Sequence, residues 1–210
     1  ALALQPIRAG DAADALRLLE AARAAAESGG DRILLGKVVN NIGAVHHGAG
    51  RYGEALACFR EALDVRQGLG YREGVVTNLH NVGDTLLRMD EVARAWASFT
   101  HARELASEVG WARGEAMNEV YLAYIDGTRG DGEALARLHA ARSRAESLAD
   151  KETAAQAAWL LGRLHLNRGE VAPARDHLTQ ARAQAEALAA DLLLRDIGQD
   201  LAQLDTGLPA

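Results

Sequence analysis

The sequence predicts an all-α fold, a solenoid in which antiparallel helix pairs stack one on the next. The first observation behind this prediction is an internal repeat. The sequence resembles itself when it is shifted by the number of residues that separates Gly43 from Gly83. The second is composition: 49% of the residues are hydrophobic but only 4% are aromatic, so small side chains fill the core and let helices approach closely. The third is that no stretch alternates apolar and polar residues as a half-buried strand does.

The repeat is clearest between the segments that begin at Asn40 and His80. Aligning these two segments places Gly43 on Gly83 and matches the apolar residues that follow them. In the third repeat Ala123 replaces the glycine, and the distance in sequence from this position to the next small residue of the repeat is slightly shorter. The structural repeat positions taken from this alignment are Gly43, Ala55, Phe59, Ala62, Gly83, Ala95, Phe99, Ala102, Gly162, Ala174 and Leu178.

Each repeat contains two expected helices, because apolar residues recur at steps of three and four between glycine-containing turns. In chain order these helices span residues 11–28, 33–49, 52–69, 73–88, 91–109, 113–128, 131–148, 153–168, 171–189 and 192–205. The first is expected to be the second helix of a repeat whose first helix is mostly missing. The organisation is therefore a partial first repeat (1–30), four helix pairs (31–70, 71–110, 111–149 and 150–190), and a capping helix with a tail (191–210).

Small residues are expected where the helices of a pair cross. Gly43, Gly83 and Gly162 lie on the first helices, where a side chain would force the axes apart, and alanines face them from the second helices. Phe59 and Phe99 are expected to fill the space between successive repeats. In the capping helix one stripe is apolar and the opposite stripe is expected to face solvent. The stripes are Leu194, Ile197, Leu201 and Leu204, and Arg195, Asp196, Gln199, Asp200 and Gln203.

The pairs Ile42-Gly43, Val82-Gly83 and Leu161-Gly162, each followed by Ala…Phe/Leu…Ala, resemble the tetratricopeptide repeat family across almost the whole chain. The repeat here is longer than that family's usual unit, which has about 34 residues. It is similar to the long-repeat subgroup of Pins-type adaptors and of sensor arms in bacterial kinases and signalling ATPases. The resemblance implies a right-handed superhelix whose concave groove is lined by the first helix of each repeat.

Counting from the crossing glycines gives the expected groove residues: Lys37, Asn40, Asn41, His47, Thr77, His80, Asn81, Asp84, Met117, Tyr121, Tyr124, Gln156, Trp159, Arg163 and Asn167. Asn41 and Asn81 occupy the same place in consecutive repeats. A side-chain amide both donates and accepts, so these two residues can hold a peptide backbone whatever its sequence. The alternative is that they bond only to neighbouring helix ends or water.

Aromatic residues suggest two further surfaces. Tyr121, Tyr124 and Trp159 are expected to form an aromatic patch in the groove, the usual carrier of binding energy. The alternative for all three is ordinary core packing. Tyr71 and Trp111 lie at the same place in consecutive turns between repeats and are expected to cover helix ends, the alternative being a partner contact on the edge of the solenoid.

No set of residues predicts catalysis or a bound cofactor. The G-x-G-x-x-G spelled by residues 48–53 follows an expected helix, whereas a dinucleotide-binding loop follows a strand. His80 and Asp84 have a spacing that metal ligands can use, but two ligands are too few for a site. The sequence therefore predicts neither an enzyme nor a metal protein.

Charge and cysteine content limit the classes of partner and the cellular compartment that the sequence predicts. A net charge of −6 and a pI near 5.6 argue against nucleic acid, and no apolar run is long enough to span a membrane. The single cysteine, Cys58, excludes an internal disulfide and fits a cytoplasmic, reducing compartment. Heavy use of Arg, Ala and Gly favours a bacterial source.

Two functions remain. The leading hypothesis is a scaffold for protein–protein interaction that holds a peptide segment or partner helix in the groove. The alternative is a ligand- or peptide-sensing arm of a larger bacterial regulator, kinase or ATPase. The apolar face of residues 11–28 is also expected to permit self-association.

Overall fold

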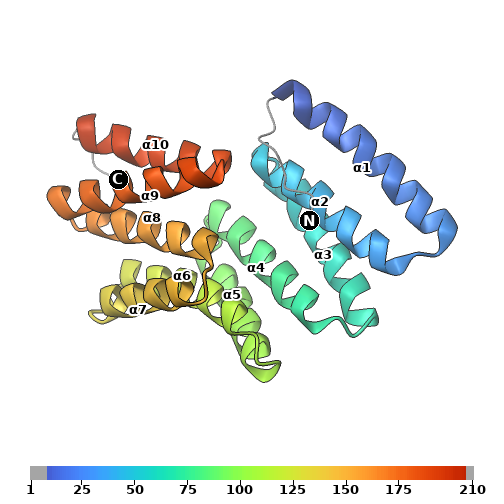
Figure 1. Cartoon of the computed structure of the whole chain (residues 1–210), viewed down its shortest axis with the longest axis horizontal. Helices are drawn as coiled ribbons and strands as arrows, with labels where there is room; N and C mark the ends of the chain where they lie inside the picture. Colours follow the sequence, from blue (N-terminus) through green and yellow to red (C-terminus); the bar gives the residue numbers. More distant parts are fainter. Residues whose placement is uncertain (1–8, 207–210) are drawn as a thin grey trace. The chain divides into compact units, whose positions relative to one another are not determined.

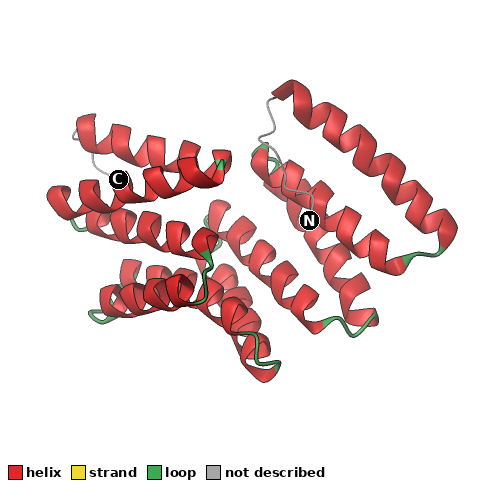
Figure 2. Ribbon diagram, in the orientation of Figure 1, coloured by secondary structure: helices red, strands yellow, loops and turns green. Residues whose placement is uncertain are grey.

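The computed structural model describes residues 9–206, and within that range all regular structure is α-helical (Figure 2). In chain order the helices are α1 Ala9–Gly29, α2 Arg32–Gly48, α3 Tyr52–Gly68, α4 Arg72–Arg88, α5 Val92–Glu108, α6 Ala112–Thr128, α7 Ala134–Ser147, α8 Lys151–Asn167, α9 Val171–Leu188 and α10 Asp191–Thr206. Every helix begins and ends close to the bounds that the sequence predicts. The all-helical fold class is confirmed. The outermost parts of the predicted terminal segments, 1–8 and 207–210, lie outside the described residues.

Contacts divide the chain into two compact units, Ala1–Gly114 and Glu115–Ala210. In the first unit α1 packs on α2, α2 on α3, α3 on α4, and α4 on α5 (Figure 1). In the second unit α7 packs on α8, α8 on α9, and α9 on α10. Consecutive packing of this kind is that of a helical repeat, in which each hairpin buries its apolar face against its neighbours.

The turns repeat one geometry, which explains why glycine marks them in the sequence. After α3, Gly70 adopts a left-handed φ of +66°, and the Tyr71 N–H donates to the Arg66 carbonyl at 3.0 Å. This bond satisfies a carbonyl that the end of the helix leaves without a partner. After α7 and α9, Ala149 and Ala189 take the same left-handed conformation with φ of +55° and +51°.

The crossing glycines make room for a large side chain on the partner helix. An ideal Cβ on Gly43 would lie 2.7 Å from Phe59 Cε1, and one on Gly83 would lie 2.8 Å from Phe99 Cε1. The same substitution at Gly162 would meet Leu178 Cγ at 2.7 Å. Real Cβ atoms do not approach carbon so closely, so these glycines are required by packing.

The structure adds a contact within each pair for the two phenylalanines. Phe59 and Phe99 are predicted to fill the space between successive repeats, and each ring lies against the glycine of its own helix pair. The physical reason is that a missing Cβ opens a hollow in the first helix, and a flat ring from the second helix of the same pair fills it.

The turn aromatics cover helix ends, as the sequence predicts. Tyr71 lies over Gly74 in the first turn of α4, and Trp111 lies over Gly114 in the first turn of α6. Tyr71 keeps 49% of its surface exposed, whereas Trp111 is half-buried.

The last helix departs from the expected pattern at two residues. Ile197 and Leu204 face inward as predicted, but Asp196 and Asp200, which were expected on the solvent side, are 5% and 9% exposed. For Asp200 the cause is a specific partner, because its Oδ2 accepts a hydrogen bond from Trp159 Nε1 at 2.6 Å. The inward face of α10 is therefore partly polar.

Candidate functional site

Three asparagines connect the first helices of consecutive pairs in the first unit. Asn40 lies on α2, and its side-chain Oδ1 accepts hydrogen bonds from Asn78 Nδ2 at 3.1 Å and from Asn81 Nδ2 at 3.0 Å, both on α4. Asn78 is fully buried and also donates to the Phe59 carbonyl at 3.2 Å. Asn40 and Asn81 are half-buried, so the cluster runs from the core to the surface. We call Asn40, Asn41, Asn78 and Asn81 the amide seam.

The amide seam has hydrogen-bonding capacity left over. Within residues 9–206, Asn40 Nδ2, Asn81 Oδ1 and the side chain of Asn41 have no hydrogen-bond partner. Asn40 and Asn81 hold each other in place through their remaining atoms. The spare groups are thus positioned in advance, which lowers the entropy lost when a ligand binds.

Other predicted groove residues of the first unit bond to one another. His47 Nε2 lies 3.3 Å from Asp84 Oδ2, and Asp84 Oδ1 lies 3.8 Å from Arg88 Nε. The His80 ring packs edge-on against Phe99, with 5.4 Å between centroids. Asp84 is therefore paired with His47 on the preceding first helix. Among the residues that the structure describes, no three His, Cys, Asp or Glu side chains form a group that could hold a metal ion.

In the second unit the expected aromatic patch is buried. Tyr121, Tyr124 and Trp159 are 3%, 6% and 3% exposed, in agreement with the core-packing alternative. The guanidinium of Arg163 lies over two of these rings, 5.6 Å from the Tyr124 centroid and 5.3 Å from that of Trp159. Its Nε is 3.6 Å from Asp200 Oδ2 on α10. An open aromatic surface was therefore the wrong expectation.

The remaining predicted groove residues range from exposed to half-buried. Exposed side chains are Lys37 and Asn167, and partly buried ones are Thr77, Met117 and Gln156. Thr77 donates from Oγ1 to the Glu73 carbonyl at 3.0 Å, within its own helix. The α1 face expected to self-associate exposes 61% of Leu18, and self-association stays a prediction.

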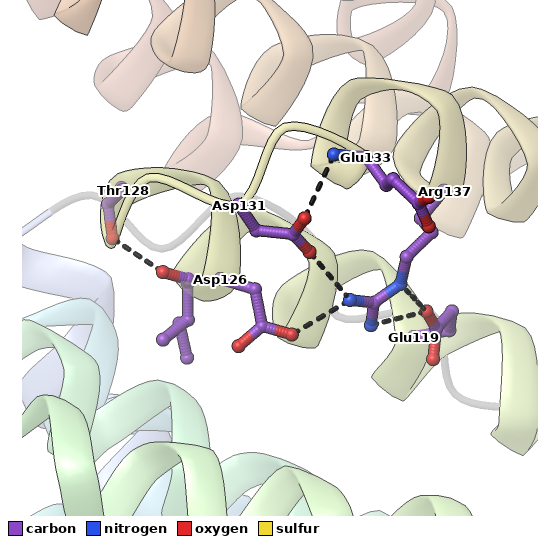
Figure 3. A network of polar contacts seen from close by, with 7 residues as sticks. Glu119, Asp126, Thr128, Asp131, Glu133 and Arg137 are labelled. Carbon is purple, nitrogen blue, oxygen red and sulfur yellow. Dashed lines mark hydrogen bonds and ion pairs between the residues drawn. The ribbon is translucent and has the colours of Figure 1, made fainter.

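A charged network at the α6–α7 hairpin was not identified from the sequence (Figure 3). Arg137 donates to Glu119 Oε1 at 2.8 and 3.0 Å, to Asp126 Oδ2 at 2.9 Å and to Asp131 Oδ2 at 3.3 Å. Burial lowers the pKa of Arg137, but the hydrogen bonds to Asp126 and Glu119 outweigh it and raise the pKa overall. All the donors face carboxylates of the same hairpin, so the network holds the turn between α6 and α7 in place.

Three histidines meet on α7, α8 and α9 in the second unit. The rings of His165 and His177 stack at 5.3 Å with 6° between their planes, and His139 lies 5.5 Å from His177. Burial, together with Arg142 and the neighbouring histidines, lowers the pKa of His139 and His177, against a small opposing effect of Asp176 on His177. His165 Nδ1 is paired with Glu170.

This cluster predicts that acidification destabilises the fold. Because the folded chain lowers the pKa of His139 and His177, the unfolded chain binds more protons once the pH falls below about 6.5. Stability is therefore full above that pH and decreases below it. We expect the midpoint of urea unfolding to fall between pH 7.5 and 5.5, and to fall less in His177→Gln. An equal fall in both proteins would show that other groups cause the pH dependence.

No described helix combines the length and the apolar character needed to cross a membrane. The sequence profile of the tetratricopeptide repeat family matches residues 2–67 and 35–108, which together make up half of the chain. The chain belongs to the tetratricopeptide repeat family. In this tetratricopeptide protein the profile match contains both Ile42-Gly43 and Val82-Gly83, so the glycine contacts at Gly43 and Gly83 lie in matched repeats.

Two solved structures show the same fold. BtubC (BKLC) from P. vanneervenii aligns with a TM-score of 0.62 at 20% identity, covering 92% of this tetratricopeptide chain and 84% of that chain. A Rap protein complexed with competence and sporulation factor aligns with a TM-score of 0.68 at 16% identity, covering 89% of this chain and 53% of that chain. The chain thus spans about half of the Rap protein. No curated protein matches the sequence.

Proposed function

We propose that this tetratricopeptide protein is a non-catalytic scaffold that holds an extended peptide segment of a partner protein against α2 and α4. The observation that carries the proposal is the amide seam, in which Asn40 and Asn81 fix each other and keep a donor and an acceptor unused. An extended peptide presents one N–H and one carbonyl per residue, which are the complements of those groups.

The surroundings of the seam support this role. Lys37 is exposed one turn before the seam on α2, and the His47–Asp84 pair follows the seam on α2 and α4. Acidic side chains of a bound peptide would pair with Lys37. The hydrogen bonds to the peptide backbone do not depend on this charge. The Rap structure, which has this fold, is complexed with competence and sporulation factor, and this supports the binding of a separate factor.

The proposal predicts which substitutions weaken binding. Peptides selected from a random display library on the intact chain should bind Asn41→Ala/Asn81→Ala more weakly by about 1–3 kcal/mol for each buried hydrogen-bonding site lost. Asn40 Oδ1 keeps its bond from Asn78 in this variant, so the helical circular dichroism should not change. Fluorescence anisotropy of labelled peptides measures the affinity.

The matched control is Gln67→Ala, which removes an exposed side-chain amide from α3. It should leave peptide affinity unchanged. Equal affinity of the seam variant and the wild-type chain would remove the seam from the binding site, and a loss of affinity only together with a loss of helicity would do the same.

The alternative function is a sensing arm, in which a bound peptide or small ligand changes the shape of the protein. The likeness to the Rap structure is the observation that favours it. Small-angle scattering of the full chain with and without a selected peptide separates the two functions. A changed profile at saturation supports the sensing arm, and an unchanged profile supports a passive scaffold.

A further inference from the structure

One buried cation in the first unit has no acidic partner among the described residues. Arg66 lies in the last turn of α3 and is only 8% exposed. Its one hydrogen bond within the described residues runs from Nη1 to the Gly74 carbonyl at 2.9 Å. Burial lowers the pKa of Arg66, and the only charge effect that opposes it comes from Tyr71. Buried cations are normally paired with a carboxylate, so the absence of one here needs an explanation.

Comparison with the other repeats shows that Arg66 is an exception to the packing. The carbonyl of Arg66 accepts the N–H of the residue five positions on, and the same bond occurs at the end of the other second helices and of α1. The equivalent residues are Ala26, Ala106, Ala145 and Ala185, and all are buried. Four small apolar residues and one arginine at the same place indicate that packing does not require the arginine.

The chain makes room for the arginine with two glycines. An ideal Cβ on Gly36 would lie 3.5 Å from Arg66 Cγ, and one on Gly74 would lie 2.8 Å from Arg66 Cδ. The aliphatic stem is thus enclosed between α2 and α4.

The hydrogen bond to Gly74 leaves a defined edge of the guanidinium unused. With Nη1 committed, Nε and Nη2 remain as two parallel donors. This fork matches the two oxygens of a carboxylate and forms the strongest kind of charged hydrogen bond. Arg32 on α2 lies against the end of the same helix, with Nη2 3.3 Å from an ideal Cβ on Gly68, and it has no ion pair within the described residues.

We propose that Arg66, beside the half-exposed ring of Tyr71, binds the carboxylate of an acidic residue from a partner protein at this edge of the first unit. The site lies between the end of α3 and the beginning of α4, and the arginine stem contacts Gly36 and Gly74, which precede Asn40 and Asn78 by one turn. It uses different side chains from the peptide site proposed above. The two sites together would give a partner one backbone contact and one charged anchor.

Side-chain NMR of arginine in the full 210-residue chain tests the proposal directly. The Nε–Hε signal of Arg66 should shift downfield and saturate as sodium acetate is added, and sodium chloride at matched ionic strength should leave it unmoved. Asn41→Ala/Asn81→Ala should show the same acetate response, so a failure here is distinct from a failure of the seam. An unmoved signal in acetate, or a response to phosphate at lower concentration than to acetate, would overturn the proposal.

A second measurement uses a hexaglutamate peptide with a fluorescent label. Arg66→Met should bind it at least about tenfold more weakly than the wild-type chain, and Arg66→Lys, which keeps the charge but removes the fork, should lose a similar factor. Arg17→Met removes the same charge from an exposed site on α1 and should change affinity little. Equal binding by the wild-type chain and both Arg66 variants contradicts the site, and Arg66→Lys keeps the test decisive if Arg66→Met folds poorly.

Discussion

Truncation of Phe99 to alanine is expected to lower the free energy of unfolding by about 3–5 kcal/mol. The ring is fully buried, lies against Gly83, and packs edge-on with His80. Its removal loses the transfer energy of the ring and leaves a hollow that two helices with fixed turns cannot close. Urea denaturation followed by circular dichroism measures the change, and the slope of the transition should stay constant.

A control in the same unit separates packing from general loss of apolar surface. Leu18→Ala truncates a side chain that is 61% exposed and should change stability by no more than about 0.5 kcal/mol. If Phe99→Ala cost as little as Leu18→Ala, the ring would not be part of the core.

Substitution of Gly83 by valine is expected to cost about 1–3 kcal/mol or more, because the new side chain would meet the Phe99 ring. Alanine at the same position should also destabilise, since its Cβ would lie 2.8 Å from Cε1. The informative comparison is Gly198→Ala in α10, where an ideal Cβ meets nothing within 4 Å. That change should stabilise by up to about 1 kcal/mol through helix propensity alone. Thermal unfolding should therefore show a lowered Tm for Gly83→Ala and a raised Tm for Gly198→Ala.

The third helix pair differs from the others at both positions. In the sequence alignment Ala123 replaces the crossing glycine and Leu138 replaces the phenylalanine, and both are fully buried. Copying this pair as Gly83→Ala/Phe99→Leu should recover part of the stability that Gly83→Ala loses. We expect a coupling of about 1 kcal/mol in the double-mutant cycle. Strict additivity would mean that the two positions do not touch.

The sequence was sufficient for the helices because glycine and the regular repeat spacing are local signals. Gly70, for example, marks both the end of α3 and the left-handed turn that follows it. Sequence spacing also indicates which residues share a helix face, so Gly43 and Gly83 were correctly expected at helix crossings.

Sequence spacing says less about which side chains meet across helices. The partner of Asn81 is Asn40 rather than Asn41, because adjacent first helices are offset in their contacts. Asp200 points inward toward the Trp159 indole N–H and the Arg163 guanidinium, and both of these partners belong to the neighbouring helix. The contribution of Asn78 could have been suspected from Asn118 at the same place in the next repeat, since both are fully buried polar residues on first helices.

The central claim, that the amide seam holds a partner's backbone, is tested most directly by side-chain amide NMR of the intact chain. On addition of a selected peptide, the NH₂ signals of Asn40, Asn41 and Asn81 should shift and saturate together, at the concentration that anisotropy gives for binding. The exposed amide of Gln67 should not move. Saturable binding that leaves the seam signals in place would contradict the account.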